Sequence, residues 1–121
     1  MVLVDTSVWI SHLREGNTRL EMLLNDGKVM CHPFVVGELA CGNIRNRAEV
    51  LALLQHLPTA LEAKNEEVLQ FIETNGLSGK GSGYIETHLC ASALLSALPL
   101  WTLNKSLSRI TNRLNISFPG C

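Results

Sequence analysis

Hydrophobic and polar positions along the chain follow two alternating patterns. Short, largely apolar runs occupy residues 1–4, 29–31 and 100–103. Runs of this kind are typical of buried strands in a parallel sheet. Between these runs, apolar residues recur at every third or fourth position, which predicts amphipathic helices.

Polar caps, glycines and prolines set the expected limits of the helices. Asp5-Thr6-Ser7 is an N-cap cluster, Pro33 suits the first turn of a helix, and Gly16 and Pro58 each end one. We expect helices from about residue 8 to 15, 20 to 24, 33 to 41, 44 to 57, 62 to 73, 83 to 98 and 107 to 114. Residues 76–83 hold four glycines and predict a loop, and residues 116–118 predict a last edge strand.

The alternation of strands and helices favours an α/β fold with a parallel sheet. The length of 121 residues fits one domain, spanning 1–121. In such folds, sites form at the carboxyl ends of the strands. Asp5 and Asn104 both follow expected strands.

Composition narrows the class of protein. Hydrophobic residues make up 46% of the chain and charged residues 17%, which supports a packed core. The net charge of -1 excludes a global basic field for nucleic acid. No signal peptide and no apolar run of membrane-spanning length are present, so we expect a soluble, cytoplasmic protein. The four cysteines (Cys31, Cys41, Cys90 and Cys121) form no C-x-x-C pair and are expected to be free thiols.

Three carboxylates stand in unusually apolar surroundings. Asp5 directly follows four apolar residues, Glu38 lies within FVVGELA at 34–40, and Glu86 begins a helix whose next charge is Lys105. Acidic residues are rarely buried unless they are paired or bind a ligand. Each also has an ordinary structural interpretation: a helix cap for Asp5, an exposed helical stripe for Glu38, and a favourable helix-dipole contact for Glu86.

Taken together, the acids suggest a cation site. Carboxylates that converge repel one another unless a cation joins them, and Mg²⁺ prefers oxygen ligands. Zinc is disfavoured because the histidines and cysteines have no ligand spacing. On a helical wheel Glu86 and Cys90 share a face, whereas His88 points elsewhere. We therefore expect His88 to be a hydrogen-bonded or surface histidine, and His32 to be unremarkable.

Four segments, in order, resemble the motifs of PIN-domain ribonucleases, especially VapC-type toxins. They are VLVDTSVWI at 2–10, GEL at 37–39, GYIETHL at 83–89 with ASA at 91–93, and LWTLNKSL at 100–107. The resemblance implies a single PIN-like domain with a central parallel sheet of four to five strands and helices on both faces. It also implies a homodimer and inhibition by a small antitoxin protein.

The same resemblance implies a Mg²⁺- or Mn²⁺-dependent endoribonuclease site. Asp5, Glu38 and Glu86 would be the acidic metal ligands, and Asn104 would take the fourth catalytic position. Two of these residues differ from the usual pattern of the family. The third position, here Glu86, is usually Asp, and the fourth, here Asn104, is often Asp. Ser7 and Thr102 match the supporting polar positions.

Our hypothesis is that Asp5 and Glu86 hold the metal, while Glu38 assists it or accepts the proton of the attacking water. Lys80, Lys105 and Arg109 are candidates for phosphate contacts, or are solvated surface charges. The residues Trp9, Leu13, Leu20 and Leu23 form either an antitoxin groove or ordinary core.

Two other functions are considered. A non-catalytic PIN-like scaffold that binds RNA or protein would have the same motifs with a decayed site. A haloacid-dehalogenase-like phosphatase also begins with a strand that ends in Asp, but it needs a second Asp where this chain has Ser7.

Overall fold

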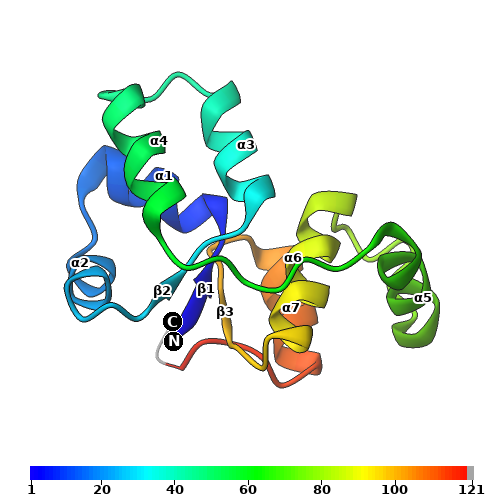
Figure 1. Cartoon of the computed structure of the whole chain (residues 1–121). Helices are drawn as coiled ribbons and strands as arrows, with labels where there is room; N and C mark the ends of the chain where they lie inside the picture. The colour runs from blue at the N-terminus through cyan, green and yellow to red at the C-terminus, as the bar shows by residue number, and fades with distance from the viewer. Residues whose placement is uncertain (120–121) are drawn as a thin grey trace.

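The computed structural model describes residues 1–119 of the chain, so Cys121 lies outside the described residues. Within that range the fold is α/β, with helices and short strands alternating (Figure 1). The strands are β1 (Val2–Val4), β2 (Val29–Met30) and β3 (Leu100–Trp101). The helices are α1 (Thr6–Glu15), α2 (Thr18–Asn25), α3 (Pro33–Cys41), α4 (Arg47–His56), α5 (Asn65–Asn75), α6 (Tyr84–Leu95) and α7 (Lys105–Arg113).

The sheet is parallel, with β1 at its centre in the order β2-β1-β3. Leu3 pairs with Met30 on one side and with Leu100 on the other. The sequence predicted a sheet of four to five strands, whereas the sheet in residues 1–119 has three. The expected edge strand at 116–118 is wrong, because Ser117 makes only an isolated bridge to Leu100.

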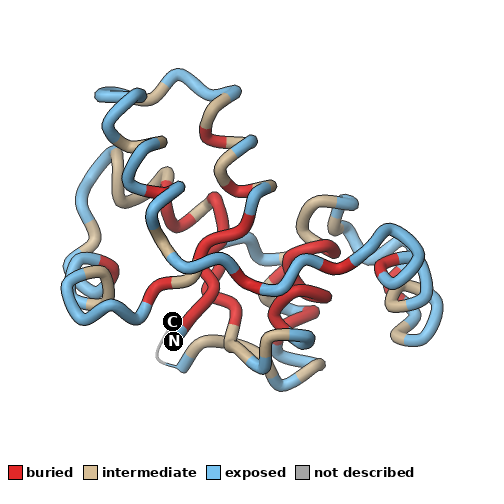
Figure 2. Tube along the Cα trace, viewed as in Figure 1, coloured by how far each residue is buried: buried red, intermediate tan, exposed pale blue. Residues whose placement is uncertain are grey.

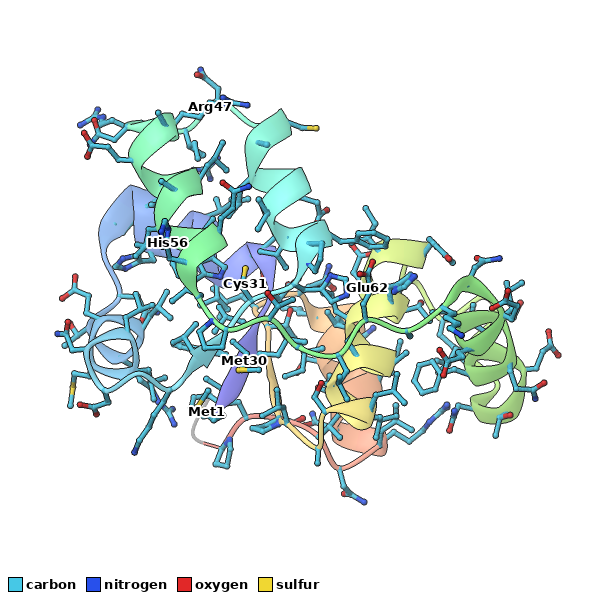
Figure 3. The ribbon with its side chains drawn as sticks, in the orientation of Figure 1. Met1, Met30, Cys31, Arg47, His56 and Glu62 are labelled. Carbon is cyan, nitrogen blue, oxygen red and sulfur yellow. The ribbon has the colours of Figure 1, made fainter. Side chains whose placement is uncertain are left out.

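The expected helices are all present, and polar side chains cap four of them. In α2 the cap is Asn17, whose side-chain oxygen accepts from the N–H of Leu20 at 2.9 Å. The Asp5 carboxylate caps α1, the His32 ring caps α3 just before Pro33, and the Asn104 amide caps α7. In Figure 1, α6 and α7 lie to the right of the strands, while α1, α2 and α4 lie to the left. Arg47, at the top of Figure 3, donates from its guanidinium to the carbonyl of Ala40 and so ties α4 to the end of α3.

The core is centred on the sheet and on α6. All three residues of β1 are fully buried, and the buried trace in Figure 2 continues from the strands into α6. Trp9 and Leu20 are buried in this core, so the alternative in which they form a surface groove is wrong. A second, smaller cluster joins α5 to α6 through Ala63, Val68 and Ala91. No helix within residues 1–119 combines the length and the apolar character needed to cross a membrane.

Candidate active site

The carboxyl ends of β1 and β3 bring the first and fourth motifs together. Because the two strands are parallel neighbours, Asp5 and Thr102 follow them at the same edge of the sheet. The backbone N–H of Asp5 donates to the carbonyl of Trp101 at 2.9 Å, which fixes the register at this edge. The sequence-based expectation that Asp5 stands at a strand end is confirmed.

Asp5 is held by hydroxyl groups through only one of its two oxygens. Its side chain is 5% exposed. The hydroxyls of Ser7 and Thr102 donate to Oδ2 at 2.6 Å and 2.8 Å, and the backbone N–H of Ser7 donates to the same oxygen at 3.4 Å. Since these contacts all use Oδ2, the lone pairs of Oδ1 stay available to a cation or a donor. Ser7 and Thr102 therefore support Asp5, as their place in the sequence suggested.

The same hydroxyls connect Asp5 to the start of α7. The backbone N–H of Leu103 donates to Ser7 Oγ at 3.0 Å, and that of Asn104 donates to Thr102 Oγ1 at 3.0 Å. Asn104 is exposed, and its side-chain oxygen accepts from the N–H of Leu107 at 3.1 Å. Its amide is thus engaged as the helix cap while its backbone belongs to the Asp5 network.

Glu38 comes to the site from the last turns of α3. The hydroxyl of Thr6, the neighbour of Asp5, donates to Glu38 Oε1 at 2.6 Å. This bond crosses 32 residues and fastens α3 to the first turn of α1. Thr6 is a site residue that sequence reasoning missed, because within the N-cap cluster only Asp5 and Ser7 carried a motif signal.

Glu86 lies in the first turn of α6 and folds back over Gly83. A Cβ atom placed on Gly83 would lie 2.9 Å from Glu86 Oε2, so this carboxylate occupies the space that a side chain at 83 would fill. One turn further on, Cys90 is fully buried, and its pKa is raised to about 12 by burial and then by the charges of Asp5 and Glu86.

Within the part of the chain that the structure describes, the hydrogen bonds to these acids come from hydroxyl groups and a backbone N–H, not from basic side chains. In residues 1–119, no lysine or arginine is paired with Asp5, Glu38 or Glu86. In that same range, no three His, Cys, Asp or Glu side chains lie close enough together to hold a metal ion. Hence any divalent ion would take one or two carboxylates directly and water for the rest, the coordination that Mg²⁺ commonly has in proteins.

The histidines differ from expectation. His88 is 3% exposed and its Nδ1 has no hydrogen-bond partner, so the expectation of a hydrogen-bonded or surface side chain is wrong. Its ring instead packs against the rings of Phe34 and Tyr84. His32 is fully buried. Its pKa is lowered to about 4, mainly because of burial and to a smaller extent because of repulsion from His88. His88 also has a lowered pKa because of burial, partly offset by Glu62, which lies beside α6 (Figure 3).

Two arginines that the sequence did not single out line a hollow with one of the acids, Glu38. Lys80, Lys105 and Arg109, the expected phosphate contacts, are all exposed. A hollow of about 420 Å³ lies between α1 and the α3–α4 segment, and Glu38 shares its lining with Arg14 and Arg45. We refer to it as the arginine hollow. Nothing in the local sequence marks these two arginines, because the fold alone brings positions 14 and 45 together.

Comparison of the sequence with known proteins gives evidence on the family that does not depend on the structure. Two curated relatives from Mycobacterium tuberculosis, one from strain CDC 1551 / Oshkosh and one from strain ATCC 25618 / H37Rv, are each named Ribonuclease VapC32. Each is 44% identical over 108 residues, which cover 88% of this chain and 87% of the relative. No family model matches the chain. Identity this high over nearly the whole length means that the chain belongs to the VapC-type toxin ribonucleases, the family that its four motifs resemble.

Proposed function

We propose that this protein is a toxin endoribonuclease that hydrolyses phosphodiester bonds of single-stranded or structured RNA with the help of Mg²⁺ or Mn²⁺. The observation that carries the proposal is the unequal hydrogen bonding of the two carboxylate oxygens of Asp5. This buried carboxylate has one oxygen held by the hydroxyls of Ser7 and Thr102 and the other without a donor, at the carboxyl edge of β1 and β3.

The donor set suits a hard divalent ion. Asp5 and Glu86 would hold it, with Glu38 as a third, water-mediated ligand, because oxygen ligands without a paired lysine or arginine are what Mg²⁺ and Mn²⁺ prefer. When bound, such an ion supplies an activated water and neutralises the charge that develops on the phosphate.

The side chains of the chain then have separate tasks. Ser7 and Thr102 keep the Asp5 carboxylate in one orientation, so that Oδ1 faces away from the hydroxyls. Thr6 holds Glu38 through Oε1, which leaves Oε2 to take the proton of the attacking water. Arg14 and Arg45, in the arginine hollow, would neutralise phosphates of the RNA backbone. Asn104 caps α7 and belongs to the site through its backbone.

The partners and the setting follow from the family. We propose that residues 1–121 form one PIN domain, that the protein is a cytoplasmic homodimer, and that a small antitoxin protein inhibits it. The VapC name of the relatives supports the antitoxin and the RNA substrate.

Substitution of Asp5 by Asn tests the reaction. We expect wild-type protein to cleave total RNA with Mg²⁺ or Mn²⁺ present and not with a chelator. Asp5→Asn keeps the size of the side chain but removes its charge, so the cleavage rate should fall at least about a hundredfold. Circular dichroism of the variant checks that it is folded. Full metal-dependent cleavage by Asp5→Asn would refute the assignment.

A second candidate, the non-catalytic RNA- or protein-binding scaffold, is favoured by one observation. Residues 1–119 hold no ready-made cluster of three ligands. Titration of Mn²⁺ by calorimetry, with and without a single-stranded oligoribonucleotide, separates the two. An affinity of millimolar or better that is lost in Asp5→Asn supports the nuclease, whereas no binding in either condition supports the scaffold.

A further inference from the structure

A second hollow, on the other side of Glu38 from the arginine hollow, is apolar and aromatic. It measures about 560 Å³, within the range of about 300–1,000 Å³ seen for small-molecule sites. We call it the aromatic hollow. Its main lining is Phe34, Gly37, Glu38 and Cys41 of α3 with Tyr84 and Ile85 of α6.

The sequence explains why α3 presents this face. Positions 34, 37, 38 and 41 are spaced by three or four residues, so they lie along one side of the helix. Phe34 and Glu38 are therefore neighbours one turn apart. The carboxylate that Thr6 holds at the acidic site and the Phe34 ring line the same hollow.

Both aromatic rings are fixed, yet neither belongs to the apolar core. Tyr84 is 45% exposed and Phe34 is half-buried, and neither is part of the packed hydrophobic cluster. The hydroxyl of Tyr84 donates to the side chain of Asn65 at the start of α5. An exposed aromatic ring that adds nothing to the core, but is held in one orientation, is preorganised for a flat ligand.

Buried His88 holds the two rings from behind. Its ring centroid lies 4.5 Å from that of Phe34 and 5.1 Å from that of Tyr84, at interplanar angles of 63° and 85°. His32 packs against Phe34 as well, with centroids 5.1 Å apart. Edge-on contacts of this kind are favourable, and they leave the outer parts of the Phe34 and Tyr84 rings uncovered.

We propose that the aromatic hollow is a stacking subsite for one unpaired nucleobase of the RNA, next to the phosphate that is cut. This inference rests on the proposed function, because it takes the acids as the cleavage centre. An RNA strand supplies phosphates for the arginine hollow and bases for the aromatic hollow, and the two hollows meet at Glu38. Aromatic rings accept any base face, and a base must leave a duplex to reach them. The subsite thus selects for unpaired nucleotides around the cut.

The test measures binding apart from cleavage. A fluorescein-labelled single-stranded oligoribonucleotide of mixed sequence is titrated with wild-type protein in chelator, at low salt, and its anisotropy is followed. We expect Phe34→Leu and Tyr84→Leu each to weaken binding at least about fivefold, the loss of one stacked base. Tyr84→Phe keeps the ring but loses its hydroxyl bond to Asn65, so it should weaken binding less than Tyr84→Leu does. Phe71→Leu removes a ring on α5 away from the hollow, so it should bind as wild type.

A second ligand separates stacking from a purely structural role. The same labelled strand with abasic residues keeps every phosphate but has no base to stack. We expect the two Leu variants to bind this abasic strand as wild type does. An equal loss of affinity for both strands, a loss in Tyr84→Phe as large as in Tyr84→Leu, or no RNA binding by wild type would overturn the subsite. Unchanged RNA affinity in both Leu variants would also overturn it and leave the hollow to a protein partner.

Failure of the subsite and failure of the nuclease proposal give different results. Wild-type protein that cleaves RNA with Mn²⁺, and Leu variants that bind like it, would refute only the stacking subsite. Wild-type protein that never cleaves, but whose RNA binding depends on the two rings, would refute only the nuclease.

Discussion

At the scale of single residues, Gly83 determines where the Glu86 carboxylate can lie. Any larger residue would place its Cβ atom 2.9 Å from Glu86 Oε2. Since that oxygen ends a flexible side chain, it would swing away at little cost to the fold. The position of the carboxylate, rather than the stability of the protein, is what the glycine protects.

We therefore predict that Gly83→Ala lowers RNA cleavage by at least about tenfold, because Glu86 is a metal ligand in the proposed mechanism and a displaced ligand costs much of the rate. The free energy of unfolding should change by less than about 1 kcal/mol, the usual effect of Ala at an N-cap. Cleavage rates and urea denaturation measure the two effects. Activity equal to wild type in Gly83→Ala would contradict the prediction.

Buried His32 predicts how stability depends on pH. Its pKa is about 4 in the folded protein and about 6.5 in the unfolded chain, so between these values the unfolded chain binds more protons. Stability must then fall as the pH drops from 6.5 towards 4. We expect His32 to account for a loss of about 2 kcal/mol between pH 7 and pH 5.

The variant His32→Asn isolates this effect. Asparagine does not titrate, yet its side chain can still accept the hydrogen bond that the N–H of Phe34 donates to His32 Nδ1 at 3.0 Å. Urea denaturation from pH 7 to pH 5 should show a shallower loss of stability in the variant. An identical slope in both proteins would mean that His32 contributes nothing to it.

The sequence predicted residues of the site only where a local pattern marked them. Asp5 was recognisable because it directly follows a buried run, and the structure places it at the expected strand end. Thr6, Arg14 and Arg45 carried no such mark. Folding alone brings Thr6 into hydrogen-bond contact with Glu38 and places the two arginines in the lining of the same hollow as Glu38. The metal-binding roles of Asp5, Glu38 and Glu86 stay predictions.

At the scale of secondary structure, the helices followed from periodicity, and the strands were less certain. A helix repeats its apolar face over several turns, so an error at one position changes little. The run at 116–118 had the composition of a strand but only one bridge forms there, through Ser117. Whether an apolar triplet pairs along its length depends on its neighbours, which the local sequence does not specify.

Helix α7 provides a prediction of its own, because Asn104 is its cap. Asn104→Ala removes the bond to the N–H of Leu107 and should lower the free energy of unfolding by about 1 kcal/mol. Asn104→Asp keeps the cap, so its stability should match wild type, and its added charge should strengthen Mn²⁺ binding. Urea denaturation and calorimetry measure both. An Asn104→Ala protein as stable as wild type would show that the cap contributes nothing.

At the scale of the whole molecule, the α/β class and the parallel sheet were predictable, whereas the size of the sheet was not. Three short strands suffice in residues 1–119 because α6 is buried along most of its length and shares the core with them. The residues of α6 are largely apolar, as is typical of a central element. How much of the interior it would fill depended on packing with β3, a contact that only the fold creates.

The bond between Asp5 and Thr102 joins positions 97 residues apart. During synthesis on the ribosome, Asp5 emerges early, whereas its second hydroxyl partner, Thr102, emerges 97 residues later and is followed by α7. A polypeptide interrupted before Thr102 therefore contains Asp5 and Ser7 but lacks the second hydroxyl that orients the Asp5 carboxylate. Such a fragment should not cleave RNA, so the activity arises only after Thr102 has been added to the polypeptide.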